Sequence, residues 1–479
     1  MSGSLLDRKI EGELAQGKQG WFKAFRRSRA FRTFVRDRAA VVALGVISVY
    51  ISIAVLIIGA QLVNAISGDR LADTFIVKEL SMARATERVG PDSLPGFFEQ
   101  ADADTRLQHA DYMLSQVERE LDREDPEAAL RDVNFAELRV VDAPIEEIDT
   151  LVMAAYDQLD EVDIIYEDYE NLLDDLADAR EEVRTAVSEA DAQAAQQRID
   201  TLKQDTDEAY TELLTALDVL DERVDAVLPD PAGFGGFMYN MRLLLGTDSQ
   251  GRSIMWRAVY SIRVATQVGL VSAIIAVVVG AFLGAMAGFF GGWVDHAIVW
   301  LYSTLSSVPY IVLLTVVAFV FGSMEVTVPF TDGVKVHQTL IPMYVAFGVT
   351  FWIAPCRQIR GEALKIRSLD YVQSATALGA GRFYIMRKHI IPNVLFLVFI
   401  NFSLIFIGAI KSEVILSFLG IGVQGQPSWG VMISESRGEV LKQFFWQIGS
   451  ATAFMFGLVL AFNVFSDALQ DAFDPKHAR

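Results

Sequence analysis

The chain has 479 residues, of which 52% are hydrophobic and 21% charged, and its formal net charge is −20. High apolar content and strong acidity seldom belong to one soluble core, and here they separate along the sequence. Residues 69–230 hold 45 of the 61 acidic residues but 14 of the 41 basic ones, so this block carries −31 and the remainder +11. The remainder is too apolar to be disordered. Its basic residues lie beside apolar runs rather than on a soluble patch, which argues against nucleic acid as a partner.

The N-terminal part predicts a membrane anchor. Residues 1–38 contain ten basic and four acidic residues with interleaved aromatic residues, a pattern that favours a membrane surface and its lipids. Residues 39–63 then carry no charge, which is long enough to cross roughly 30 Å of hydrocarbon. We expect a retained membrane helix over 39–64 rather than a cleaved signal peptide. Its basic flank places the N-terminus in the cytoplasm.

Five more apolar stretches follow the acidic block, and with the first they predict six membrane-spanning helices and a cytoplasmic C-terminus. They lie at about 264–290, 295–322, 339–356, 393–410 and 446–466. The segment 357–392 holds seven basic and two acidic residues, and the span count also makes it cytoplasmic, as the positive-inside rule requires. The predicted fold is an all-α polytopic protein of the cell (inner) membrane.

Two spans carry local signals for packing. Gly280, Gly284 and Gly288 recur every four residues in the second span, which favours close approach of another helix. Alternatively, glycine is simply common in membrane helices. In the third span, Pro309 follows four hydroxyl-bearing residues and predicts a kink, which lines a pathway or serves packing alone.

The acidic block predicts an extracytoplasmic helical insertion over 65–240. Apolar or small residues recur there in two runs with three- and four-residue spacing, which is typical of a coiled-coil seam. The first run comprises Ile145, Ile148, Val152, Ala155, Leu159, Val162, Tyr166, Tyr169, Leu173 and Leu176, and the second Ile199, Leu202, Thr206, Ala209, Leu213, Ala216 and Leu220. One continuous helix over both runs would extend roughly 130 Å. We therefore expect a coiled-coil hairpin that turns near 188–197, with its charge serving solubility and partner selection.

Motifs for catalysis and for bound cofactors are missing from the sequence. It contains no G-x-x-x-x-G-K-[ST], no H-E-x-x-H and no G-x-S-x-G. The single cysteine, Cys356, cannot form an internal disulfide, and we interpret it as a small apolar residue near a helix end. We predict no catalytic residue, no cofactor and no metal site, so the chain is not expected to be an enzyme.

The cytoplasmic segment 371–393 is the strongest functional signal. Helical spacing before Gly379, a break at 379–381 and a second short helix that ends at Pro392 predict a helix-turn-helix at the membrane surface. A protrusion of this kind suits mechanical contact with a cytoplasmic partner.

This segment resembles the coupling motif of the six-span permease subunits of ABC importers, in particular the second-permease (C-type) branch of dipeptide, oligopeptide and nickel systems. The family motif reads E-A-A, three residues, G, nine residues, I-x-L-P. The chain has Gln and Ser in place of the Glu and the first Ala, and His-Ile-Ile before the proline. The coupling residues implied by the resemblance are Gln373, Ser374, Ala375, Gly379, Ala380, Gly381, Arg382 and Pro392.

Three further stretches are similar to the peptide branch of that family. One is Gly246-Thr247-Asp248 followed by Gly251-Arg252, with Ser253 where Asp is usual. Another begins at Glu413 and continues through Gly420 and Gly422 to Trp429. The third is the C-terminal run 460–475. The resemblance covers 246–475, and the large insertion departs from the much shorter outer loop of the family.

The resemblance implies a permease for short peptides with several partners: a second homologous permease subunit, two cytoplasmic ABC ATPase subunits and an extracytoplasmic solute-binding protein. Closure of the ATPases would push on the helix around Gln373–Arg382. The expected organisation is a basic segment (1–38), a first span (39–64), the insertion (65–240) and a permease core (241–479) with its coupling loop (357–392). The alternative is a membrane-anchored extracytoplasmic coiled-coil protein that acts as a tether or sensor.

Overall fold

The computed structural model describes most of the chain. The described residues are 36–67, 80, 82–86, 88–89, 103–123, 125–126, 130, 140–186, 189–229, 233–323, 340–423 and 425–473. Within these ranges the regular elements are helices, accompanied by two isolated β-bridges. The all-α fold class is therefore confirmed. Most of the predicted basic segment 1–38 lies outside the described residues.

The chain divides into two compact units. The first, called the apolar unit below, comprises Met1–Met82, Ala258–Glu435 and Ala451–Arg479. The second, called the acidic unit, comprises Ala83–Arg257 and Ser436–Ser450. Residues 241–257 and 436–450, which the sequence assigns to the permease core, thus fold with the insertion.

Four helices are long and apolar enough to cross a membrane alone. They are α3 (Arg38–Ser67), α11 (Ile254–Phe290), α18 (Ile391–Phe418) and α21 (Trp446–Phe473). A fifth span results if α12 (Gly292–Ser306) and α13 (Tyr310–Gly322) are counted together. The fourth predicted span falls on α14 (Ile341–Phe351), which has 11 residues, and on the charged α15 (Ile353–Arg367). The described helices therefore provide four or five spans, and the sixth stays a prediction.

The break predicted at Pro309 is confirmed, and it is sharper than a kink. Helices α12 and α13 meet at 89°. The N–H of Ser307 donates to the carbonyl oxygens of Ser303 and Thr304 and ends α12, while Pro309 precedes the first residue of α13. Proline has no N–H and fixes φ, so it suits a helix start and cannot continue the helix before it.

Helix α15 lies directly on the glycine ladder of α11. A Cβ on Gly284 would lie 2.6 Å from the carbonyl oxygen of Cys356, and one on Gly288 would lie 2.6 Å from that of Arg360. At Gly280 the carbonyl oxygen of Trp352 would be 2.7 Å away. Helix backbones approach this closely only through residues without side chains, so the three glycines are required for this packing.

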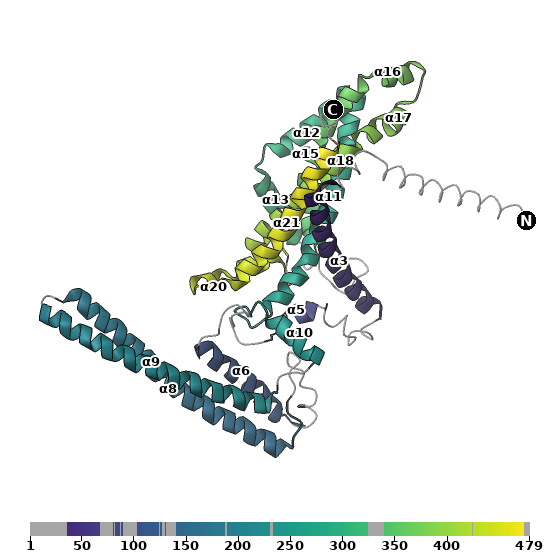
Figure 1. Cartoon of the computed structure of the whole chain (residues 1–479). Helices are drawn as coiled ribbons and strands as arrows, with labels where there is room; N and C mark the ends of the chain where they lie inside the picture. Colours follow the sequence, from purple (N-terminus) through teal and green to yellow (C-terminus); the bar gives the residue numbers. More distant parts are fainter. Residues whose placement is uncertain are drawn as a thin grey trace, which may run out of the picture. The chain divides into compact units, whose positions relative to one another are not determined.

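The acidic unit is built on two long helices, α8 (Ile145–Thr185) and α9 (Glu189–Val227), which run side by side as a hairpin (Figure 1). The predicted hairpin is therefore observed, but its turn is not at 188–197. Helix α8 ends at Thr185, where its C-cap residue Ala186 is extended, and α9 already begins at Glu189, so residues 189–197 are helical. The small core of Leu176, Ala179 and Ile199 continues both seams close to the reversal. Both helices therefore extend further toward each other than the prediction allows.

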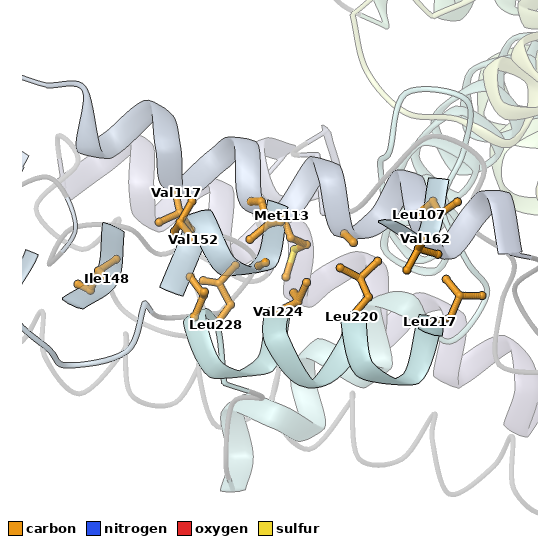
Figure 2. Packing of buried hydrophobic residues seen from close by; sticks show 14 of the residues in the cluster. Leu107, Met113, Val117, Ile148, Val152, Val162, Leu217, Leu220, Val224 and Leu228 are labelled. Carbon is orange, nitrogen blue, oxygen red and sulfur yellow. The ribbon is translucent and has the colours of Figure 1, made fainter. Parts of the chain in front are cut away.

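Helix α6 (Ala103–Leu121) completes the core of the acidic unit with both arms of the hairpin. Figure 2 shows its Leu107, Met113 and Val117 facing the apolar side chains of α8 and of the C-terminal half of α9. Most seam residues that the spacing predicts are buried or partly buried, whereas Leu173 is 40% exposed. Each fully buried aliphatic side chain contributes about 1.5–3 kcal/mol, so this core holds the acidic helices together in water.

Candidate functional site

The helix-turn-helix predicted within the coupling loop 357–392, called the loop below, begins with α16 (Asp370–Ala377), which ends in a complete Schellman motif. The N–H of Ala380 donates to the carbonyl of Ala375 at 3.1 Å, and that of Gly379 donates to Thr376 at 3.0 Å. Gly379 has φ of +81°, which a residue with a Cβ adopts only at a cost. Ala375 and Ala380 also face a common apolar cluster, as this motif requires. The turn is therefore set by local sequence.

The second arm of the loop differs from its prediction. It begins at α17 (Arg382–Ile385), with Gly381 as its N-cap residue, but it does not end at Pro392. It passes through the π-helical turn η2 (Met386–Ile390) and continues into α18, so one helical segment runs from Arg382 to Phe418. Pro392 would clash with a carbonyl one turn earlier in a regular α-helix. The wider π turn, in which the Ile391 N–H donates to Met386, accommodates the proline without ending the helix.

The inner side of the loop is packed against two helices of the apolar unit. Val372, Ile385 and Met386 are buried, together with Phe289 of α11 and Ile359 of α15. Helix α15 is in turn fixed by a bidentate ion pair, in which Arg360 contacts Asp295 of α12 at 2.5 and 2.7 Å. The loop is therefore held by side-chain packing along its length and not only by its connections to the flanking helices.

The outer side of the loop presents large apolar side chains to solvent. Leu378, at the turn, is 89% exposed, and Phe383 of α17 is 67% exposed. Gln373, Ser374 and Arg382 are exposed beside them. Large apolar side chains exposed on a protrusion are typical of a protein contact surface.

In the acidic unit, the first outer motif forms a buried ionic cluster around Asp248. Its Oδ1 accepts the N–H groups of Gln250 and Arg252, and its Oδ2 accepts from the guanidinium groups of Arg252 and Arg257. Asp248 and Arg257 are almost fully buried, and a buried charge is stable only when paired in this way. Gly246 and Gly251 have positive φ and shape the turn that holds the carboxylate.

The same loop starts α11. The Ser253 hydroxyl accepts the N–H of Trp256 at 3.2 Å and donates to the carbonyl of Arg242 at 2.6 Å. Serine, like aspartate, is a good N-cap residue, so the replacement at this position keeps the capping of α11, while the donation to Arg242 requires the hydroxyl.

Two residues from 436–450 complete the contacts of this motif, and the spacing of the sequence around them does not predict that they do so. Glu439 of α20 (Arg437–Leu441) accepts the N–H of Ser249 at 2.6 Å, and Trp446 donates its indole N–H to the carbonyl of Thr247 at 3.2 Å. Burial raises the pKa of Glu439, although the N–H of Ser249 opposes this effect. The first outer motif is therefore held by a segment that lies about 190 residues further along the chain.

In the apolar unit, the second outer motif ends α18 with another Schellman motif. Gly420, with φ of +77°, donates to Ser417, and Ile421 donates to Leu416. The Ser417 hydroxyl donates to the fully buried carboxyl group of Glu413 at 2.8 Å. Any side chain on Gly422 would collide with Ser417.

Trp429 opens α19 (Trp429–Glu435) and anchors it on α11. Its indole N–H donates to the carbonyl of Ala258 at 3.0 Å, and its ring meets that of Tyr50 of α3 edge-on at 6.5 Å. The residue is 1% exposed, so this signature residue has a packing role in the described structure. The structure thus keeps the two outer motifs in different units, each with its own contacts.

Comparison with known proteins agrees with these motifs. Residues 280–479 match the family described as binding-protein-dependent transport system inner membrane component. The dipeptide transport system permease protein DppC of Bacillus subtilis is 32% identical over 235 residues, which cover 49% of this chain and 69% of the relative. The chain belongs to this family.

Two other relatives show the same extent of similarity. The oligopeptide transport system permease protein OppC of Haemophilus influenzae is 32% identical over 48% of this chain and 70% of its own length. The glutathione transport system permease protein GsiD of Pectobacterium atrosepticum is 33% identical over 48% and 72%. The resemblance drawn from the four motifs is confirmed, and the family accounts for about half of the chain.

Proposed function

We propose that the chain is a permease subunit of an ATP-driven importer of short peptides. It forms the translocation path with a second homologous permease, and separate ATPase subunits and a solute-binding protein complete the transporter. Relatives named for dipeptide, oligopeptide and glutathione transport support peptides as the solute class. Family membership favours this function over a tethering or sensor protein.

The observation that carries the proposal is the two-sided coupling loop. Its inner side is buried against α11 and α15, and its outer side exposes Leu378 and Phe383. A partner that binds the outer side would therefore move these helices with the loop. A cytoplasmic ATPase is the partner that the family and the basic flank of 357–392 favour.

The proposed topology has six spans, with both termini in the cytoplasm and the acidic insertion outside the cell membrane. The charge distribution and the four or five observed spans support it. On the outer side, the acidic insertion would contact the solute-binding protein or the second permease. Deletion of residues 70–235 should then impair assembly or uptake, and an unchanged transporter would contradict this role.

The test is purification of the tagged chain in mild detergent, with mass spectrometry of the copurifying proteins and peptide uptake in the same strain. Wild type should recover an ATPase and a second permease. The Gly379→Arg variant should remain in the membrane and keep the second permease, but lose the ATPase and the uptake. Gly379→Asn is the matched control, because asparagine tolerates positive φ. Recovery of neither partner with intact wild type would reject the proposal.

A further inference from the structure

A cavity of about 980 Å³ opens in the apolar unit where two of its predicted spans are interrupted. Pro309 and Tyr310, at the break between α12 and α13, line one side. Phe351 and Ile353, which flank the junction of α14 and α15, line another, and α18 contributes Asn401. Irregular backbone at membrane depth is tolerated where it is covered by protein or faces a cavity, and discontinuous helices often build transport sites.

The cavity wall is mostly apolar, with a small set of placed polar groups. Asn401, which is 5% exposed, donates to the side-chain oxygen of Gln358 at 2.6 Å. Arg357 donates to the hydroxyl of Ser306 at 2.9 Å, and its guanidinium carbon lies 4.8 Å from the ring centre of Tyr302. These contacts hold the guanidinium in place and leave other N–H groups of Arg357 with no hydrogen-bond partner among the described residues. A few fixed polar groups in an apolar wall are typical of a small-molecule site.

Charge distinguishes Arg357 from its neighbour on the same helix. Arg360 is neutralised by the bidentate pair with Asp295. Arg357 forms no ion pair within the described part of the chain, and no acidic residue is among the described residues that line the cavity. An unpaired guanidinium beside an apolar wall attracts an anion strongly, and its planar fork matches a carboxylate.

We infer that this cavity is a solute subsite in the translocation path, in which Arg357 binds the carboxylate of the transported peptide. Gln358 and Asn401 would contact its amide groups. The inference rests on the proposed function and names the part of the solute that the permease itself recognises. It predicts that the permease contributes to selection for solutes with a free carboxylate.

The first test measures peptide uptake and ATPase activity of the whole transporter in liposomes, with loaded binding protein outside. Arg357→Gln should lower the initial uptake rate about tenfold or more, because a charge-assisted contact is lost. Arg357→Lys, which keeps the positive charge but not the planar fork, should lower the rate less than Arg357→Gln does. Lys411→Gln is the matched control, because it removes an exposed positive charge from the apolar unit outside the coupling loop. ATPase stimulation by the binding protein should be unchanged in all three variants.

The outcomes separate the two proposals. Absence of peptide uptake by the assembled wild type would reject the proposed function. Uptake by wild type with full activity of Arg357→Gln would overturn the subsite alone. Equal losses in Arg357→Lys and Arg357→Gln, together with a fall in ATPase stimulation, would assign Arg357 a structural role and also overturn it.

A second test asks what occupies the cavity. Leu404→Cys, at a cavity-lining position that is 48% exposed, made with Cys356→Ala to remove the single native cysteine and with Arg357 kept, should react with a water-soluble anionic thiol reagent in the assembled transporter. A transported dipeptide, delivered by its binding protein, should slow this reaction. If the cysteine is protected from the reagent both with and without dipeptide, a helix of the second permease covers the cavity, and the subsite is overturned. Labelling at the same rate with and without dipeptide would also overturn it.

Discussion

The two units of this protein pack their helices by opposite means. In the apolar unit, α11 meets α15 through glycines, and backbone atoms approach where side chains would collide. In the acidic unit, α8 and α9 meet through layers of leucine and valine. Lipid offers no hydrophobic gain for helix association, so close backbone contact must supply the attraction. Water does offer that gain, and the acidic helices use it in spite of their charge.

The largest expected effect follows from filling the glycine ladder. Gly284→Leu should destabilise the apolar unit by more than about 3 kcal/mol, because its side chain would meet backbone rather than a movable side-chain end. Gly45→Leu is the matched control, since nothing lies within 4 Å of a Cβ there. The measurement is the thermal midpoint and the monodisperse yield in detergent. Equal yields for the two variants would show that close approach is not required.

A cavity in the hairpin should have a similar but smaller effect. Leu217→Ala, at a fully buried position, should lower the stability of the acidic unit by about 3 kcal/mol through lost burial and an unfilled space. Leu214→Ala, one turn away and 37% exposed, should cost much less. Hydrogen exchange of the full chain, followed by mass spectrometry, reports α8 and α9 separately. Equal effects of both substitutions would argue against the observed seam.

The smallest effect concerns pH. Burial lowers the pKa of His109 in α6, although the carboxylate of Asp221 opposes this effect. The folded state therefore favours the neutral imidazole of His109. The free energy of unfolding keeps its full value above the pKa of an unfolded histidine, about 6.5, and falls as pH drops from there toward the lower pKa of the folded state. The slope is at most about 1.4 kcal/mol per pH unit.

Hydrogen exchange of α6 between pH 7 and pH 5.5, corrected for its intrinsic pH dependence, measures the change. His109→Gln should remove the pH dependence, and α11 should show none from this source. A dependence that persists in the variant would assign it to other groups.

Local features were predictable from the sequence because their causes are local. Gly379 fixes a helix end through its own φ, and Pro309 fixes a break through its missing N–H, so neither needs knowledge of the rest of the chain. The seams of α8 and α9 were predictable from their spacing alone. The turn between them carries no glycine or proline, and its place depends on how the two seams align.

Contacts between distant segments gave no such signal. The sequence suggests Asp248 as a motif residue, but its partner Arg257 and the closing Glu439 follow from the three-dimensional path of the chain.

The continuation of the helix through Pro392 was also missed, because a proline normally indicates a helix end. A π turn absorbs the proline, and its formation depends on packing of Met386 and Ile390 rather than on spacing.

The uninterrupted helical segment Arg382–Phe418 has a mechanical consequence. Its 37 residues extend about 55 Å, more than the thickness of a membrane's hydrocarbon layer. On the proposed function, a push on Phe383 would be transmitted along this segment toward Glu413 and would pass through the π turn Met386–Ile390 on the way. The π turn beside Pro392 is the place where this segment departs from regular α-helical geometry and can bend. The exposed contact residue Phe383 and the π turn, where the helix can bend, therefore lie only a few residues apart in one segment.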